Sequence, residues 1–212
     1  MPELRELYDA ILNGDHKTSA AVTREAIDAG IEPMELVSGY MVPAMDEVGK
    51  RFECEDYFIP ELLLSARAMK AALELLRPLL AASGAKSAGR VVIGTVKGDL
   101  HDIGKNIVGA MLEGGGFEVI DLGADVAPQK FIAAIKERNP QLICLSALLT
   151  VTMPSMKTTI EAFKEAGVRD GVKVIVGGAP VTAEFAREIG ADGFGENATA
   201  AVALARQLLQ AA

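Results

Sequence analysis

The sequence predicts two successive regions of different fold class: a four-helix bundle, followed by an α/β domain with a five-stranded parallel sheet. Residues 1 to about 83 carry apolar side chains at helical spacing throughout. From about residue 90, short β-branched runs alternate five times with amphipathic segments. Between the two regions lies SGAKSAGR, a small, polar, glycine-bearing stretch that is typical of a linker. We therefore expect a linker at 83–89 and domains at 1–88 and 89–212.

Four helices with short connections predict an up-and-down bundle in the first region. PELRELYDAIL starts behind a proline, and DHKTSAAVTREAIDAG begins with Asp15 as a candidate N-cap and ends at Gly30. EPMELVSGYMVPAMDEVGKRF is longer, and we expect Pro43 to kink it. IPELLLSARAMKAALELLRPLLAA is the longest and most apolar of the four.

In the second region, the alternation of strands and helices predicts a flavodoxin-like (Rossmann-like) domain with helices on both faces of the sheet. The predicted strands are RVVIGTV, FEVIDLG, QLICLSAL, VKVIVGG and ADGFG, and the predicted helices cover 104–114, 128–139, 154–167, 182–190 and 197–210. Such sheets bind ligands just beyond the carboxyl ends of their strands. The expected site is therefore the first strand–helix turn, which holds KGDLHDIGK.

Composition excludes several classes of function. The net charge is −8, and no cluster of lysines and arginines is present, which argues against nucleic acid or an anionic membrane surface as the main partner. No apolar run reaches the length of a membrane span, and the N-terminus lacks the features of a signal peptide. Cys54 and Cys144 are far apart in the sequence and are expected to be free thiols in a reducing cytoplasm.

Three chemistries could use the turn KGDLHDIGK. A phosphate cradle requires a glycine-rich run, but only Gly98 and Gly104 are present, and two carboxylates would repel phosphate. A phosphoacceptor site could use Asp99, but it gives no role to the histidine two residues later. The third chemistry is the presentation of His101 to a metal that is held by a cofactor.

The third chemistry fits the residues best. Side chains at i and i+2 of an extended loop lie on one side, so Asp99 can hold one ring nitrogen of His101, as carboxylates do for metal-bound imidazoles. One histidine cannot hold a bare metal ion, and His16 lies in the other predicted domain. The metal would have to arrive in a macrocycle with His101 as axial ligand. The alternative is an ordinary surface or capping pair of histidine and aspartate.

The sequence resembles the cobalamin-binding module of methionine synthase and its relatives. Their pattern is DxHxxG, then SxL, then GG. Here the first motif is Asp99-Leu100-His101-Asp102-Ile103-Gly104, the second is Ser146-Ala147-Leu148 after residues 105–145, and the third is Gly177-Gly178 after residues 149–176. Both gaps fit the family, and the resemblance covers nearly the whole chain because the N-terminal helices are similar to the family's helical cap.

The resemblance implies a set of site residues. His101 would replace the cofactor's dimethylbenzimidazole on the lower face of the cobalt, and Thr152 would complete a His–Asp–hydroxyl relay with Asp99. The implied cofactor-binding positions of this domain are Gly98, Asp99, Leu100, His101, Asp102, Ile103, Gly104, Ser146, Leu148, Thr150, Thr152, Gly177, Gly178 and Ala198.

Two groups of these positions have a structural alternative. Small residues at the strand ends, from Ser146 to Ala179, would leave a channel for the nucleotide tail, but close packing of helices on the sheet also favours small residues. The two threonines could instead cap a helix ahead of Pro154. In the cap, Phe52, Ile59 and Leu62 match side chains that cover the upper face of the cobalt, and their spacing equally suits a bundle core.

The family further implies a methyl carrier rather than a self-sufficient catalyst, cycling between cob(I)alamin and methylcob(III)alamin. The chain resembles small corrinoid proteins of systems for methanol, methylamines, methoxylated aromatics or betaines. The implied partners are a substrate-specific methyltransferase, a second methyltransferase with tetrahydrofolate or coenzyme M as acceptor, and a reductive activase. A cobalamin-binding subunit of a radical mutase and a cobalamin-dependent sensor are the alternatives.

Overall fold

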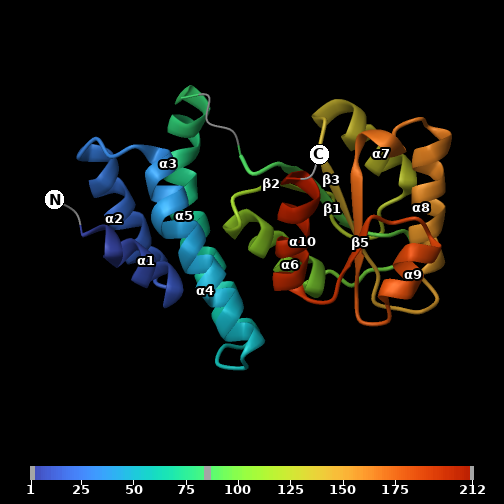
Figure 1. The fold of residues 1–212 in the computed structure, drawn as a ribbon, viewed down its shortest axis with the longest axis horizontal. Helices are drawn as coiled ribbons and strands as arrows, with labels where there is room; N and C mark the ends of the chain where they lie inside the picture. Colours follow the sequence, from blue (N-terminus) through green and yellow to red (C-terminus); the bar gives the residue numbers. More distant parts are fainter. Residues whose placement is uncertain (1–2, 84–86, 211–212) are drawn as a thin grey trace. The chain divides into compact units, whose positions relative to one another are not determined.

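A computed structural model describes residues 3–83 and 87–210 (Figure 1). The chain divides into two compact units: one ends at Ser87 and includes Glu113–Gly116, and the other comprises Ala88–Leu112 and the chain from Phe117 onward. The first unit is helical and the second is α/β, which confirms the predicted fold class. Pro2 and residues 84–86 of the expected linker lie outside the described residues.

The first unit contains four helical rods. Its elements are α1 (Leu4–Leu12), α2 (His16–Asp28), α3 (Pro33–Leu36), the π turn η1 (Val37–Met41), α4 (Val42–Glu53) and α5 (Ile59–Ser83). Asp15 caps α2 as expected, because its carboxylate accepts hydrogen bonds from the backbone N–H of Lys17 and Thr18, each at 3.1 Å. The interruption expected near Pro43 is the π turn directly before it, which accommodates a ring that cannot fit an α-helical hydrogen-bond pattern.

Apolar side chains on one stripe of each rod form the core of this unit. Fully buried members include Leu7, Ile11, Val48, Met69 and Leu76. Between α2 and α5 the buried contact includes a polar pair, in which the Ser19 hydroxyl donates to the Ala68 carbonyl at 2.9 Å. Such a small residue lets two helices approach closely while its polar group stays satisfied.

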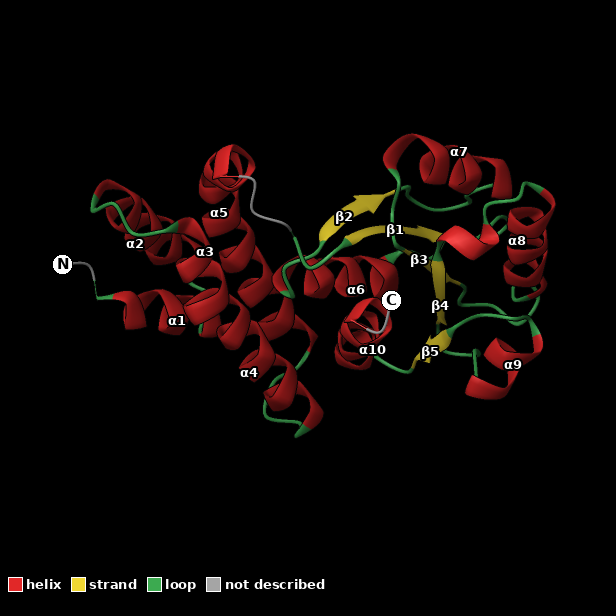
Figure 2. Cartoon of the chain, turned by 45° about the horizontal axis from the view of Figure 1, so that its top comes forward, coloured by secondary structure: helices red, strands yellow, loops and turns green. Residues whose placement is uncertain are grey.

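The second unit is a parallel sheet in the order β2-β1-β3-β4-β5. The strands are β1 (Arg90–Thr95), β2 (Glu118–Asp121), β3 (Leu142–Ser146), β4 (Lys173–Gly177) and β5 (Gly193–Gly195). The intervening segments are α6 (Ile103–Gly114), α7 (Pro128–Arg138), α8 (Pro154–Glu165), the 3₁₀ turn η2 (Arg169–Gly171), α9 (Ala183–Glu188) and α10 (Ala198–Gln210). Helices α6 and α10 lie on one face of the sheet, and α7, α8 and α9 lie on the other (Figure 1, Figure 2).

The face under α7, α8 and α9 holds a hydrophobic core. Alternate strand residues such as Val92, Ile143 and Val174 point into it, and Phe131 and Phe163 fill it from the helices. The two phenyl rings meet edge to face, with centroids 6.3 Å apart. This packing anchors the strands whose carboxyl ends carry the loops described below.

At the carboxyl ends of the strands, four small residues lie in register across the sheet: Thr95 pairs with Ser146, Ser146 with Gly177, and Gly177 with Gly195. The strand order reverses direction between β1 and β3, so the loops after these two strands diverge at the switch point. This is the position at which the sequence places DLHDIG and SALLT. None of the helices in the described part of the chain is long and apolar enough to cross a membrane.

Candidate functional site

A buried carboxylate, Asp99, lies at the centre of the loops that follow β1 and β3. Its side chain is fully buried. Oδ1 accepts hydrogen bonds from the backbone N–H of His101 at 3.0 Å and lies 2.8 Å from Nδ1 of the same residue. Oδ2 accepts from the backbone N–H of Leu148 at 2.7 Å, from that of Leu149 at 3.3 Å and from the Thr152 hydroxyl at 2.6 Å.

This set of donors keeps Asp99 ionised. Burial raises the pKa of the carboxyl, but the hydrogen bonds from the Thr152 hydroxyl, the backbone N–H groups of His101 and Leu148, and the His101 ring lower it by more. The net result is a pKa well below the ordinary value of an aspartate. An ionised carboxylate can only accept at Nδ1, so His101 carries its proton on Nδ1 and leaves Nε2 as the basic nitrogen.

The ring of His101 is half-exposed, at 49% of its side-chain surface, although its partner is fully buried. No hydrogen bond to Nε2 is present among the described residues. The main chain of His101 is held as well, because its carbonyl accepts from the buried Thr95 hydroxyl at 2.9 Å. The loop thus leaves one oriented nitrogen lone pair available at the carboxyl ends of the strands.

Thr152 is buried, and its hydroxyl lies 2.6 Å from Asp99 Oδ2 and 2.8 Å from the Leu149 carbonyl. A hydroxyl has one proton, which can be donated to one acceptor at a time. The alternative role as a helix cap does not apply, since α8 is capped by Met153 without a side-chain hydrogen bond. The structure therefore brings His101, Asp99 and Thr152 into one chain of contacts.

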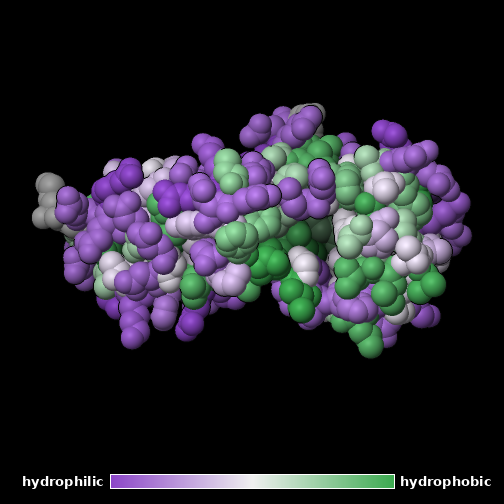
Figure 3. Space-filling view, turned by 90° about the horizontal axis from the view of Figure 1, so that it is seen from below, coloured by the Kyte–Doolittle hydropathy of each residue, from purple (hydrophilic) through white to green (hydrophobic). Residues whose placement is uncertain are grey.

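Apolar side chains surround this polar centre and face outward. Leu100 is 75% exposed, Ile103 73% and Val151 80%, and Leu148 and Leu149 are also exposed. Figure 3 views the molecule from the carboxyl ends of the strands and shows hydrophobic side chains gathered over the α/β unit. Exposed apolar groups that are clustered in this way indicate a binding surface.

The three glycines of the sequence motifs, Gly104, Gly177 and Gly178, have different structural reasons. A Cβ on Gly178, at φ +135°, would lie 1.9 Å from the Ala147 carbonyl oxygen, and one on Gly177 would lie 3.0 Å from that of Gly195. Both are therefore explained by packing within the sheet edge. A Cβ on Gly104 would meet nothing within 4 Å. Neither the backbone nor a neighbour requires glycine there, so the open space beside it suits a ligand that approaches the helix closely.

The other predicted residues lie at varied depths. In the α/β unit, Asp102 and Thr150 are exposed, Ser146 is half-buried at the end of β3, and Ala198 is buried at the start of α10. In the helical unit, Ile59 is 45% exposed at the start of α5, Phe52 is half-buried, and Leu62 is 1% exposed among the core residues of the bundle.

Two features were missed by sequence reasoning. Asp125 accepts a hydrogen bond from the backbone N–H of Gly98 at 2.7 Å, and its own N–H donates to the Asp99 carbonyl at 2.9 Å. The side chain of Lys105 is buried, and its Nζ contacts the Asp121 carboxylate at the end of β2. A lysine in a helix is usually exposed, and Asp125 is an exposed loop aspartate like many others, so no sequence signal distinguished either residue.

The residues present fit a cofactor-borne metal and not a bare ion. Among the described residues, no three histidine, cysteine, aspartate or glutamate side chains lie close enough together to hold a metal ion. One imidazole with a fixed tautomer, an apolar surround and an open space at Gly104 match a macrocycle that brings its own equatorial ligands.

Comparison with protein families identifies two matching regions. Residues 89–205 match a B12 binding domain, and residues 3–77 match a second model, also described as a B12 binding domain. Among curated proteins, trimethylamine corrinoid protein 1 of Methanosarcina acetivorans is 47% identical over 95% of this chain and 94% of its own length. The dimethylamine corrinoid protein of Methanosarcina barkeri is 48% identical over 97% of both chains.

Solved structures show the same architecture. The methanol:cobalamin methyltransferase complex of Methanosarcina barkeri contains a chain that is 30% identical, with a TM-score of 0.87 over 99% of this chain and 80% of that one. A cobalamin-binding protein of Desulfitobacterium hafniense DCB-2 is 35% identical, with a TM-score of 0.80 over 98% of this chain and 99% of that one.

Proposed function

This chain belongs to the B12-binding corrinoid proteins of methyltransferase systems, and we propose that it carries a methyl group between two methyltransferases, with His101 as the residue that would coordinate the cobalt of bound cobalamin. When bound, cobalamin supplies a cobalt centre that accepts a methyl group from one compound and releases it to another. The observation that carries the proposal is the contrast at the His–Asp pair: a fully buried, hydrogen-bonded carboxylate holds a half-exposed imidazole.

The polar centre sets the state of the imidazole. Asp99 fixes the tautomer in which Nε2 is unprotonated and available for coordination. Because the pKa of Asp99 is held low, a proton that enters the pair resides on Nε2 rather than on the carboxylate. Such a proton occupies the nitrogen lone pair, so proton uptake favours the release of the ligand. Thr152 stabilises the ionised carboxylate through its hydroxyl.

The residues around the His–Asp pair would form an apolar contact surface for the cofactor. Leu100, Ile103 and Val151 form an apolar surface suited to the flat lower face of a corrin ring. Gly104 leaves room for the ring to approach α6. Ser146 and Ala198 would hold the nucleotide tail of the cofactor, and Phe52, Ile59 and Leu62 of the helical unit would help to cover the cofactor.

The names of the relatives point to the methyl donor and to the first methyltransferase partner. Two of the most similar relatives are called trimethylamine and dimethylamine corrinoid proteins, so we assign a methylamine as methyl donor and a methylamine-specific methyltransferase as the first partner. The solved complex of a related chain with a methanol methyltransferase supports direct docking of such a partner. A second methyltransferase and a reductive activase complete the proposed cytoplasmic system.

The test uses the two histidines of the chain as a matched pair. His101→Ala, loaded with cobalamin, is expected to lose the visible spectrum of the histidine-ligated form and more than about 100-fold of methyl transfer, because ligand loss exceeds the effect of losing a supporting residue. His16→Ala lies in the helical unit and is expected to behave as the unaltered protein. An unchanged spectrum and full methyl transfer in His101→Ala would contradict the assignment.

A further inference from the structure

The loop after β2, residues 122–126, is joined by backbone hydrogen bonds to the segment that leads into the His101 loop. Beyond the ends of the strands, Val96 and Val126 form a parallel bridge. The Thr95 N–H donates to the Gly123 carbonyl at 3.0 Å, and the Val126 N–H donates to the Thr95 carbonyl at 2.9 Å. The two segments therefore continue the sheet's pairing past its edge, so the 122–126 loop can serve as a fixed support.

From this support, Asp125 holds the backbone of Gly98 and Asp99 at two points. Its Oδ1 accepts from the Gly98 N–H at 2.7 Å. Its own N–H donates to the Asp99 carbonyl at 2.9 Å. The two bonds span the peptide unit between Gly98 and Asp99, two residues ahead of the imidazole.

Both partners adopt an uncommon backbone conformation to make these bonds. Gly98 has φ +87° and Asp125 has φ +52°. A left-handed conformation is costly for most residues, while aspartate and asparagine tolerate it best among those with a Cβ. A non-glycine residue held in this conformation next to a functional loop indicates that its contacts determine the local structure.

The carboxylate of Asp99 is held by a different loop. Leu148, Leu149 and Thr152 all donate to Oδ2 from the segment after β3. The main chain of Asp99 is held by Asp125, and its side chain is held by the 148–152 segment. A change at Asp125 can therefore loosen the backbone without removing a donor from the buried carboxylate.

We propose that Asp125 is a positioning residue for His101, acting through the backbone of Gly98 and Asp99 to keep the imidazole aligned for coordination. This proposal rests on the proposed function. It assigns a role to a residue outside all three sequence motifs. Its expected effect is modest, about 3- to 10-fold on the balance between ligated and unligated histidine, because one exposed hydrogen bond is replaced by water.

Three substitutions separate the hydrogen bond from the backbone conformation. Asp125→Asn keeps an oxygen that can accept from Gly98 and tolerates positive φ. Asp125→Gly keeps the backbone conformation and removes the acceptor. Asp125→Ala removes the acceptor and disfavours the conformation. Asp170→Ala, an exposed aspartate in η2, is the control for loss of a surface charge.

Two readouts are compared in the whole protein. In the cofactor-free form, hydrogen exchange of the peptide containing 97–101 is expected to increase in Asp125→Gly and Asp125→Ala, and to stay unchanged in Asp125→Asn and Asp170→Ala. In the cobalamin-loaded form, the fraction with ligated histidine is read from the visible spectrum at one fixed pH. This fraction is expected to fall in Asp125→Gly and Asp125→Ala and to stay unchanged in Asp125→Asn and Asp170→Ala.

The outcomes are distinct. If Asp125→Gly matches the unaltered protein in both readouts, or if Asp125→Asn fails as Asp125→Ala does, the hydrogen bond is not what positions the ring and the proposal is wrong. If the unaltered protein takes up cobalamin without any histidine-ligated spectrum, the proposed function fails. Hydrogen exchange in the cofactor-free form still tests whether Asp125 holds the backbone of Gly98 and Asp99.

Discussion

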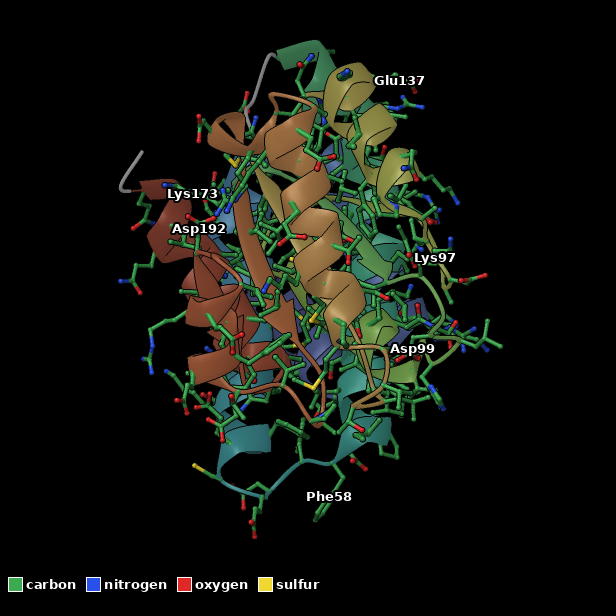
Figure 4. The ribbon with its side chains drawn as sticks, turned by 90° about the vertical axis from the view of Figure 1, so that its right-hand side faces the viewer. Phe58, Lys97, Asp99, Glu137, Lys173 and Asp192 are labelled. Atoms are coloured by element: carbon green, nitrogen blue, oxygen red, sulfur yellow. The ribbon has the colours of Figure 1, made fainter. Side chains whose placement is uncertain are left out.

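Two carboxylates near opposite ends of the strands both accept several hydrogen bonds, but from different kinds of partner. Asp192 lies near Lys173 at the amino edge, and Asp99 lies at the carboxyl edge (Figure 4). Asp192 Oδ2 accepts from Arg169 at 2.7 Å and from the backbone N–H of Val174 at 2.7 Å. Asp99 receives uncharged donors and one imidazole, and no lysine or arginine pairs with it in the described part of the chain.

The difference separates a structural carboxylate from a functional one. Arginine is always protonated, so the charge of Asp192 is permanently paired. Through its bonds with Arg169 and Val174, Asp192 links η2 to β4. Under the proposed function, the charge of Asp99 is balanced through His101 when Nε2 binds the metal of the cofactor. A site that must bind and release a ligand requires this variable compensation, and a fixed ion pair would prevent it.

The largest effect is expected from Asp99→Asn. Replacing one carboxylate oxygen with an NH₂ group sets a donor against N–H or O–H donors in a buried position, whichever way the amide turns. We expect a loss of about 3 kcal/mol in the free energy of unfolding at pH 7. The cobalamin-loaded variant should also lose most of the histidine-ligated spectrum. Urea denaturation and visible spectroscopy measure the two effects.

The pH dependence of this loss has a defined sign. The folded-state pKa of Asp99 lies below its ordinary value, so its contribution to stability is fully present above about pH 5 and is lost as the pH falls through the ordinary carboxyl range toward the folded value. The difference between the unaltered protein and Asp99→Asn should therefore change little between pH 7 and about pH 5 and shrink as the pH is lowered further, below about pH 4. A difference that grows on acidification would contradict the assigned pKa direction.

Asp192→Asn tests the other carboxylate of the comparison, at the amino ends of the strands. The variant leaves the Arg169 guanidinium, whose side chain is 14% exposed, without its carboxylate, and should cost about 2 kcal/mol of folding free energy. The spectrum and cobalamin content of the loaded protein should not change. If the ligated fraction fell as it does in Asp99→Asn, the functional distinction between the two carboxylates would be lost.

The smallest effect is expected at Thr152. Thr152→Val keeps the shape and removes the hydroxyl that lies 2.6 Å from Asp99 Oδ2, so it should cost about 1 kcal/mol and weaken histidine ligation by severalfold. Thr152→Ser retains the hydroxyl and should restore the ligated fraction. If the serine variant behaved like the valine variant, the methyl group and not the hydroxyl would carry the effect.

Sequence reasoning reached the fold because the two regions have different hydrophobic periods and because four of the five strands end in small residues. It reached the His101 turn because parallel sheets place ligand sites at the first strand–helix turn. It did not reach Asp125, whose role depends on a positive φ and on pairing between loops 27 residues apart in the chain. Lys105 was also missed, since a buried lysine has no local signature. Contacts between distant loops cannot be read from periodicity or spacing.

The central claim is that the nitrogen bound to cobalt comes from His101. Electron paramagnetic resonance of the cobalt(II) form tests it most directly, with protein labelled with ¹⁵N-histidine and loaded with unlabelled cobalamin. A spin-1/2 nitrogen ligand splits each cobalt line into a doublet, and we expect that doublet in the unaltered protein and in His16→Ala, but not in His101→Ala. A triplet from the cofactor's own ¹⁴N base, or no nitrogen splitting in the unaltered protein, would contradict the account.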